Sequence, residues 1–335
     1  MNDFKGSYKF FIGNQYCKIK DEYRLKVDKC PNCHCKVDPE KEKLLTSEKS
    51  ILEEPNVELE RQLLDLHLEN QETDDLVLLD MIDTYQNLTL KVKMAFQHTI
   101  KNVANPPPKW IIKTDDDSIL IVKKLHSLLT EVYPIELYPY LYLGRMFNNK
   151  VLSSDTPGLD PSHFAKWGEE EYQGYVDERN RKHYPTNARG PTYTLSYPLA
   201  KDLFENSDLK TYICEDTSMG IWIDERDHNL VKKAWETDKY DEYSLNLLHK
   251  QKTIYVDDKI DGHRVCSTLC TNNKIMKWKP GGFIFGSIFG WVNPHKVCKT
   301  MGDYRSSVYV LGHKLETEFI ESCYERYLGD FYGLG

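Results

Sequence analysis

The chain has 335 residues, of which 40% are hydrophobic and 29% are charged. These fractions are typical of a globular protein and exclude a mainly disordered or collagen-like chain. The formal net charge of −8 excludes a general attraction to nucleic acid, so any bound phosphate needs a local site. No stretch reaches the roughly 18 apolar residues of a membrane span, and the first residues lack a signal-peptide pattern. We therefore expect the chain as given to be soluble.

The cysteines leave several pairings open. There are nine, an odd number, so at least one has no partner within the chain. The sequence CPNCHC brings together Cys30, Cys33, His34 and Cys35, which is compatible with a zinc site, a loop disulfide or free thiols. A separate signal is the triplet Asn87-Leu88-Thr89, which predicts N-glycosylation at Asn87.

The N-terminal part of the chain predicts a strand, a charged insertion and a second apolar stretch. Residues 8–13 are a short apolar run that ends in glycine, which is typical of a buried parallel strand. Residues 17–60 interleave lysine and glutamate without a sustained period, so we expect a solvated insertion with one helix near its end. The second apolar stretch covers residues 75–81.

Residues 87–103 predict an amphipathic helix. Its apolar residues recur at spacings of three and four and so share one face: Leu88, Val92, Ala95, Phe96 and Ile100. The prolines at 106–108 end the helix, and residues 110–113 predict a buried strand that runs into the acidic residues 115–117. This order is a βαβ pattern, in which ligands bind at the carboxyl ends of the strands.

The rest of the chain alternates strands, loops and helices. We expect, in order, a strand at 138–144, a polar loop-rich segment at 148–181, a strand and a helix at 193–204, and a helix that ends near 223. Glu215 and Asp216 immediately precede that last helix, and an apolar stretch from Tyr212 leads into them. Beyond about residue 250 the pattern weakens.

The acidic triplet is the first candidate for chemistry. Consecutive carboxylates at a strand end repel one another, and a divalent cation removes that penalty. Alternate residues of an extended or turning backbone point the same way, so Asp115 and Asp117 can face one ion while Asp116 faces elsewhere. Ligation by one or two carboxylates, completed by phosphate and water, suits Mg²⁺ or Mn²⁺. The alternative for these residues alone is a solvated acidic turn.

Four motifs in order resemble one known family. They are DTYQNLTLKVKMAFQHT, WIIKTDDDSILIV, YPTNARGPTYTLS and EDTSMGIWI. Their sequence and order resemble the β-1,3-galactosyltransferase and β-1,3-N-acetylglucosaminyltransferase superfamily, glycosyltransferase family 31. The resemblance extends over residues 8–238.

The resemblance implies a GT-A fold, which is an α/β fold with a Rossmann-like nucleotide-sugar domain and a mixed central sheet flanked by helices. It implies a catalytic domain over residues 1–250 and leaves 251–335 as a C-terminal extension of unknown role. The acidic motif then binds Mn²⁺ or Mg²⁺ and the diphosphate of a UDP-sugar donor. The residues implied for this half of the site are Asp117 and Asp115 as metal ligands, and Lys113 and Asp116 as donor-binding residues, with Lys113 meeting the uridine or Asp115.

Carried onto the second acidic pair, the resemblance makes Asp216 the catalytic base of an inverting transfer. Such a transfer needs a carboxylate on the sugar face opposite the leaving diphosphate, where it takes the acceptor proton. The residues expected around the acceptor or the sugar are Tyr193, Glu215, Trp222 and Gly190. Without the family, the acidic pair is equally a helix cap.

Simpler readings apply to the aromatic residues as well. Trp222, like Trp167 and Trp235, is either a sugar-stacking or a core residue. His249 is a further candidate, as a distal metal ligand.

The motifs also depart from the family pattern. Thr217 stands where valine is usual, and Ala188, Pro191 and Thr192 replace a cysteine and two glycines in the sugar-pocket loop. By comparison with the family pattern, we expect its first strand and its membrane anchor to be missing from the sequence as given. EDTSMGIWI and the Asp227-His228 pair after it are similar to the linkage-region galactosyltransferase.

From this similarity we expect galactose as the donor sugar. N-acetylglucosamine is the alternative donor, and a non-catalytic glycan-binding protein is the alternative function. The resemblance also implies a glycan or glycoconjugate acceptor, no nucleic acid partner, and a place in the Golgi lumen, with a type II membrane anchor in the full-length family form.

Overall fold

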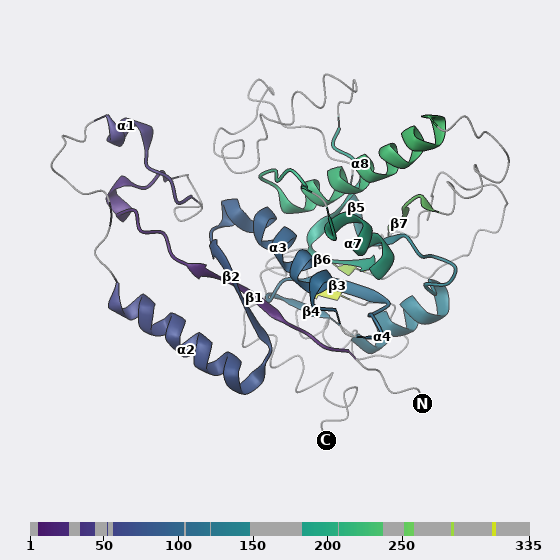
Figure 1. Ribbon diagram of the computed structural model, residues 1–335, viewed down its shortest axis with the longest axis horizontal. Helices are drawn as coiled ribbons and strands as arrows, with labels where there is room; N and C mark the ends of the chain where they lie inside the picture. The colour runs from purple at the N-terminus through teal and green to yellow at the C-terminus, as the bar shows by residue number, and fades with distance from the viewer. Residues whose placement is uncertain are drawn as a thin grey trace.

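The computed structural model describes residues 6–26, 34–43, 52, 56–103, 105–120, 122–147, 183–206, 208–236, 251–257, 283–284 and 310–312. These residues form a mixed α/β fold (Figure 1). Trp167 and His249 lie outside the described residues, and so does the side chain of Trp235.

The N-terminal unit is a parallel strand pair. β1 (Phe10–Gln15) pairs with β2 (Leu76–Ile82), with Phe10 opposite Leu76. Only Gly13 of β1 is buried, so our expectation of a fully buried strand is wrong. The reason is that side chains on the faces of this two-stranded sheet are only partly covered, so that Phe10, for example, is 49% exposed.

The described residues of the segment between these strands are solvated, as expected. It contains η1 (Asp21–Tyr23), α1 (Pro39–Glu42) and α2 (Val57–Thr73), and none of the three buries a residue. The amide oxygen of Asn56 accepts the backbone N–H groups of Glu58 and Leu59, so Asn56 caps the start of α2. The helix begins near the end of the insertion, but most of it lies beyond residue 60.

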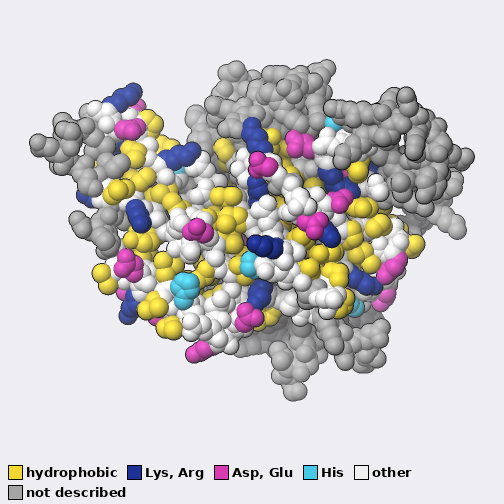
Figure 2. Space-filling view, viewed as in Figure 1, with side chains coloured by type: hydrophobic (Ala, Val, Ile, Leu, Met, Phe, Trp, Pro, Cys, Tyr) yellow, Lys and Arg dark blue, Asp and Glu magenta, His cyan; other side chains and the backbone are white. Residues whose placement is uncertain are grey.

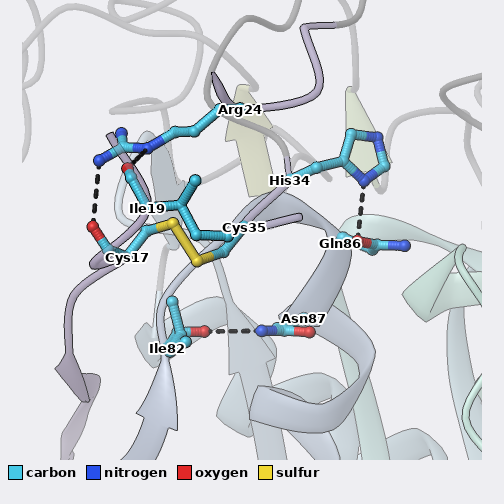
Figure 3. The surroundings of a disulfide bond; sticks show 8 residues. All are labelled: Cys17, Ile19, Arg24, His34, Cys35, Ile82, Gln86 and Asn87. Atoms are coloured by element: carbon cyan, nitrogen blue, oxygen red, sulfur yellow. Dashed lines mark hydrogen bonds between the residues drawn. A yellow bond between two sulfur atoms is a disulfide. The ribbon is translucent and has the colours of Figure 1, made fainter. Parts of the chain in front are cut away.

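A disulfide closes the insertion. Cys17 and Cys35 are bonded, which selects the loop disulfide among the alternatives for Cys35 (Figure 3). Cys30 and Cys33 lie outside the described residues. His34, next to the disulfide, makes a 2.8 Å hydrogen bond between its Nδ1 and the side-chain oxygen of Gln86 in η2 (Tyr85–Asn87). The insertion is thereby attached to the start of the following helix.

That helix is α3 (Leu88–Lys101), and the spacing predicted its buried face. Val92, Phe96 and Ile100 are buried, together with Thr89. The ring of Phe96 stacks on Phe204 at 4.7 Å between ring centroids. Burying each such apolar side chain stabilises a fold by roughly 1.5–3 kcal/mol, so this face holds α3 in place.

The central sheet has the strand order β3-β6-β5-β7. The strands are β3 (Trp110–Thr114), β6 (Asn187–Ser196), β5 (Leu141–Phe147) and β7 (Ile254–Asp257). β6 is antiparallel to both of its neighbours, whereas β5 and β7 are parallel, so the sheet is mixed. It extends past residue 250 into the segment that we assigned to a C-terminal extension.

The expected βαβ pairing around α3 is wrong. Within the described residues β3 pairs with β6, and β2 pairs with β1, so the strands on either side of α3 are not neighbours in one sheet. The sequence pattern shows only that a strand, a helix and a strand follow one another. Which strand pairs with which depends on residues that are far apart in the chain.

Apolar side chains cover the central sheet on both faces. Alternate residues of β5 point to opposite faces, and Leu141, Tyr142 and Leu143 are all 0% exposed. Tyr142 belongs to a core with α3, α7 (Tyr197–Phe204) and α8 (Glu215–Glu236). Leu141 and Leu143 belong to a second core with α4 (Val122–Ser127) and η3 (Leu128–Val132). The sheet is therefore the middle layer between two sets of helices.

Tight packing fixes α8 against β6. A Cβ atom added to Gly220 of α8 would lie 2.8 Å from the backbone oxygen of Thr186 and 2.8 Å from the Cβ of Asn187. Such contacts are too short for carbon, so only glycine lets the helix approach the strand this closely. This close approach fixes the position of α8 relative to β6, and with it the first turn of α8, which carries Glu215 and Asp216.

A smaller sheet joins the C-terminal part of the chain to the middle. β4 (Ser118–Leu120) pairs antiparallel with β9 (Val310–Gly312), which pairs parallel with β8 (Phe283–Ile284).

Helix hydrophobicity and surface charge can be compared with what the composition indicates. None of the described helices is long and apolar enough to cross a membrane. On the face shown in Figure 2, the acidic and basic side chains of the described residues are interspersed.

Candidate active site

The acidic triplet lies where the chain passes from one sheet to another. β3 ends at Thr114, Asp116 and Asp117 form a turn, and β4 begins at Ser118. The turn is therefore held on one side by the central sheet and on the other by the pairing of β4 with β9.

An irregularity in β6 supports this acidic turn. The pairing of β6 with β5 shifts register, so that Gly144 and Met146 of β5 face Tyr193 and Ala188 of β6. Within the longer β6 segment, the carbonyl oxygen of Pro191 accepts the backbone N–H of Asp115 at 2.8 Å.

The hydroxyl groups of Thr114 and Thr192 add a side-chain contact at 2.9 Å. The sequence singled out Pro191 and Thr192 as departures from the family pattern, but nothing in it predicted that they contact the turn.

The three acids differ in exposure as the alternation predicts. Asp115 and Asp117 are half-buried, and Asp116 is exposed. No group of three or more His, Cys, Asp or Glu side chains in the described part of the chain is arranged to hold a metal ion by itself. The acidic turn offers carboxylate oxygens only, a donor set that fits a hard divalent cation whose remaining ligands come from phosphate and water.

Lys113 connects the acidic turn to α8. Its side chain is 13% exposed, and its ammonium contacts the carboxylate of Asp115 and lies 3.9 Å from Oε2 of Glu215. Of the two contacts expected for Lys113, the structure contains the one with Asp115. Burial disfavours the charged ammonium, but Glu215 and Asp115 outweigh burial and raise the pKa of Lys113. The residue is therefore a buried cation between two carboxyl groups.

Glu215 is buried, and its two carboxyl oxygens have different polar neighbours. Its Oε1 accepts the hydroxyl proton of Tyr193, and its Oε2 faces Lys113. Burial raises the pKa of Glu215 to about 7, against the opposing effects of Lys113 and of the Tyr193 hydrogen bond. Burial and the nearby carboxylate also raise the pKa of Tyr193. Neither side chain faces solvent, since Tyr193 is 0% and Glu215 is 5% exposed.

Asp216 is half-buried and lies at the N-terminus of α8, as expected, but inside the first turn and not before it. The expected helix end near residue 223 is wrong, because α8 continues to Glu236. The Oδ1 of Asp216 accepts the backbone N–H of Thr217 at 2.8 Å. The helix dipole favours a charged carboxylate at this position, which suits a base. A capping side chain accepts an N–H two or three residues further along the chain, so this contact with the next residue is not a cap bond and leaves the carboxylate compatible with the role of a base.

Trp222 is a core residue, and our expectation that it lines a sugar pocket is wrong. The side chain is 1% exposed, its Nε1 donates to the carbonyl oxygen of Lys210 at 2.7 Å, and its ring packs edge-on against Phe204. It lies seven positions after Glu215 on α8, which at 3.6 residues per turn is about two turns along the helix. The helical period places it on the face that packs on α3 and α7.

Two further expected residues have defined backbone positions. Gly190 lies in β6, directly before Pro191, whose carbonyl oxygen binds the acidic turn. Asn87 precedes α3, and its Nδ2 donates to the carbonyl oxygen of Ile82 at 2.9 Å (Figure 3). The nitrogen that a glycan would modify is thus engaged in a hydrogen bond, and glycosylation at Asn87 stays a prediction.

Asp227, which the sequence analysis compared with the linkage-region galactosyltransferase, binds the residue before β7. It is 6% exposed, and its carboxylate accepts the backbone N–H and the hydroxyl proton of Thr253, directly before β7. Arg226 donates to Asp227, to Asp202 and to the carbonyl oxygen of Gln251. These contacts attach β7 to α8.

Comparisons with known proteins agree with the four motifs. The family model described as Galactosyltransferase matches residues 56–233, a range that includes the acidic turn and Asp216. The chain is 30% identical over 175 residues to hydroxyproline O-galactosyltransferase GALT5 of Arabidopsis thaliana, covering 51% of this chain and 22% of that protein.

The names of two vertebrate relatives specify other sugars than galactose. UDP-GalNAc:beta-1,3-N-acetylgalactosaminyltransferase 2 of Homo sapiens is 32% identical over 152 residues, covering 45% of this chain and 26% of that protein. Lactosylceramide 1,3-N-acetyl-beta-D-glucosaminyltransferase of Xenopus tropicalis is 29% identical over 162 residues, covering 47% and 38%. The chain thus spans well under half the length of these relatives.

Proposed function

The chain belongs to the Galactosyltransferase family, and on that premise we propose that it is a metal-dependent, inverting β-1,3-glycosyltransferase. It transfers a hexose, galactose in the first instance, from a UDP-sugar to a sugar hydroxyl of a glycan or glycoconjugate. The observation that carries the proposal is the buried contact of Lys113 with both Asp115 and Glu215, because it joins the acidic turn to the helix that presents Asp216.

The donor half of the reaction uses the acidic turn. Asp117 and Asp115 would hold Mn²⁺ or Mg²⁺, and Asp116 is exposed and accessible to the nucleotide. A bound divalent cation supplies neutralisation of the charge that develops on the leaving diphosphate. The backbone contact between Asp115 and Pro191 keeps the turn in one conformation, so little ordering is needed when the donor binds.

The acceptor half uses Asp216. Its carboxylate takes the proton of the acceptor hydroxyl while that oxygen attacks the anomeric carbon and the bond from this carbon to the UDP oxygen breaks. The new bond forms opposite the bond that breaks, so a single displacement inverts the anomeric configuration. The first turn of α8 favours the ionised form of Asp216, which is the form that accepts a proton.

Donor sugar and compartment are the least constrained parts of the proposal. The names of the relatives include galactosyl-, N-acetylgalactosaminyl- and N-acetylglucosaminyltransferases. Galactose is supported by the family model and by GALT5, and N-acetylglucosamine is the second candidate. We propose a GT-A fold and a Golgi location on the basis of the family resemblance. The Cys17–Cys35 disulfide supports an oxidising compartment.

The test is a donor screen. UDP release is measured with UDP-galactose, UDP-N-acetylglucosamine and UDP-N-acetylgalactosamine against a panel of β-glycosides, with Mn²⁺ or with a chelator. We expect Mn²⁺-dependent release with one preferred donor and a β-1,3 linkage in the product by NMR. No release with any donor, together with retained glycan binding, would instead support the non-catalytic alternative.

A further inference from the structure

Four side chains form a continuous polar network under the acidic turn. The order of contacts is Asp115, Lys113, Glu215 and Tyr193. They come from three elements, because Asp115 and Lys113 belong to β3 and its end, Glu215 to α8 and Tyr193 to β6. The network thus joins three parts of the site that local sequence does not connect.

Lys113 is the centre of this network and is poorly placed to bind a nucleotide itself. Its side chain is 13% exposed, its ammonium lies between two carboxyl groups, and it lies 5.8 Å from the ring centroid of Tyr193. One of the three donors of the ammonium contacts Asp115, and at 13% side-chain exposure little of the group is open to a ligand. The contacts therefore favour an internal role.

We infer that Lys113 is a positioning residue, which holds the carboxylate of Asp115 and the first turn of α8 at a fixed separation. The inference rests on the proposed function and specifies how its two halves are kept together. Asp115 belongs to the half that binds the donor, and Asp216 follows Glu215 directly in the half that activates the acceptor. One buried cation thereby sets the distance across which the sugar is transferred.

Tyr193 completes the arrangement. Its hydroxyl donates a hydrogen bond to Oε1 of Glu215, while the ammonium of Lys113 lies 3.9 Å from Oε2, so each oxygen of the carboxyl group faces a polar partner. The ring of Tyr193 is itself fixed by parallel stacking with Phe96 of α3, at 6.4 Å between centroids. The core is thus connected to the site through a rigid aromatic residue, which limits the rotation available to Glu215 and to the turn that carries it.

The first arm of the test uses the metal-free protein and does not depend on activity. Urea unfolding midpoints are measured for Lys113→Met, Glu215→Gln and the double variant. We expect the double variant to unfold near the midpoint of the worse single variant, because each change breaks the same contact. Lys93→Met is the matched control, since Lys93 is 14% exposed and paired with Asp208 and the carbonyl oxygen of Leu209. Its effect should add to that of Glu215→Gln. Additive midpoint shifts for Lys113 and Glu215 would overturn the inference.

The second arm measures Mn²⁺-dependent UDP affinity by calorimetry and kcat with the preferred donor. We expect Lys113→Met to lower UDP affinity about tenfold and kcat by roughly 10²-fold, and Lys113→Arg to recover about tenfold of the lost kcat. Methionine matches the shape of lysine better than arginine does, so a role in packing alone predicts the reverse order of the two variants. That reverse order, or parental affinity and kcat in Lys113→Met, would overturn the positioning role.

The two arms separate the inference from the function on which it rests. If the parent chain binds no UDP with Mn²⁺ and releases none from any donor, the proposed function fails and the positioning role fails with it. If the parent is active but the first arm is additive, the network alone is refuted. Lys93→Met should retain parental kcat and UDP affinity in the second arm, and a loss there equal to that of Lys113→Met would show that the effect is not specific to the site.

Discussion

The backbone N–H of Asp115 donates a 2.8 Å hydrogen bond to the carbonyl oxygen of Pro191. Asp115 follows the end of β3, and Pro191 lies in β6, far away in the chain. The bond forms where β6 departs from regular pairing with β5. The acidic turn therefore takes its position from the central sheet and not from its own short loop. Changes to a single acidic side chain should for this reason alter binding without unfolding the protein.

The first prediction concerns Asp117. Asp117→Ala removes one of two half-buried carboxylates at an open turn, so we expect loss of Mn²⁺-dependent UDP binding with an unchanged unfolding midpoint. Titration calorimetry with UDP, with and without Mn²⁺, is the measurement. Asp208→Ala is the control, because that side chain is fully exposed and pairs only weakly with Lys93, at 3.7 Å. Parental Mn²⁺-dependent affinity in Asp117→Ala would show that Asp117 is not a metal ligand.

The second prediction separates the two roles of Asp216. Asp216→Asn should keep UDP affinity and lower kcat by roughly 10²–10⁴-fold, because asparagine cannot take the acceptor proton. The side-chain oxygen of asparagine can still accept the N–H of Thr217. A residue that only stabilises the start of α8 would therefore leave kcat within a few-fold of the parent. Measuring kcat and donor affinity together decides between the roles.

The third prediction follows from the pKa of Glu215, which burial raises from 4.5 to about 7. Between these values the folded state binds more protons at Glu215 than the unfolded state does, so this residue makes stability fall as pH rises. Glu215→Gln lacks that slope. The free energy of unfolding of the parent, relative to the variant, should fall by about 3 kcal/mol between pH 4.5 and pH 7.

Urea unfolding of metal-free protein at several pH values measures this difference. Glu205→Gln, at an exposed position of α7's C-terminal end, should run parallel to the parent across the same range. A constant difference between the parent and Glu215→Gln would mean that Glu215 is ionised throughout, with Lys113 dominating over burial.

The fourth prediction concerns Trp222. Trp222→Phe loses the hydrogen bond to Lys210 and leaves a small cavity, so the free energy of unfolding should fall by about 2 kcal/mol. Because the side chain is 1% exposed, kcat/KM for donor and acceptor should stay within a few-fold of the parent at a temperature where both proteins are folded. A tenfold rise in acceptor KM without loss of stability would instead indicate contact with the sugar.

The fifth prediction tests the close approach of α8 to β6. Gly220→Ala puts a carbon 2.8 Å from the backbone oxygen of Thr186, so the helix must shift or the strand must yield. We expect a loss of about 1–3 kcal/mol in the free energy of unfolding and a fall in kcat, since the first turn of α8 moves with the helix. Asp208→Ala, at a fully exposed side chain between α7 and α8, is the control for the unfolding measurement. Unchanged stability in Gly220→Ala would contradict the packing.

Local patterns predicted those parts of the fold that depend on neighbouring residues. The spacing of Val92, Phe96 and Ile100 predicted the buried face of α3, and the acidic pair predicted the start of α8. Pairing between strands was not predictable, because β3 could meet β2 or β6 with the same apolar residues. The sequence also could not show that Cys35 pairs with Cys17, since nine cysteines allow many pairings.

In the candidate site, too, the sequence predicted features of neighbouring residues but not contacts between remote ones. The acidic turn could be identified from the sequence because three consecutive carboxylates repel one another unless a cation binds them. The contact of Lys113 with Glu215 could not, because it joins residues that are remote in the chain. Trp222 was misassigned because an aromatic residue near a motif has the same sequence signature in a core and in a sugar pocket. Its spacing from Glu215 does not distinguish the two, because seven residues are about two helical turns and return to the same face. The contacts with Lys210 and Phe204 identify the core role.

The pairing of β4 with β9 has a consequence for biosynthesis. A ribosome completes Ser118–Leu120, which directly follow the acidic turn, long before it reaches Val310–Gly312. Until then the nascent chain lacks the strand that pairs with β4, although the residues for α3, β3 and β6 have already emerged. Domains fold as their segments become available during translation. The two sides of the acidic turn are thus fixed at different times: β3 and β6 can pair first, whereas β4 gains its partner only after residue 312 has been made.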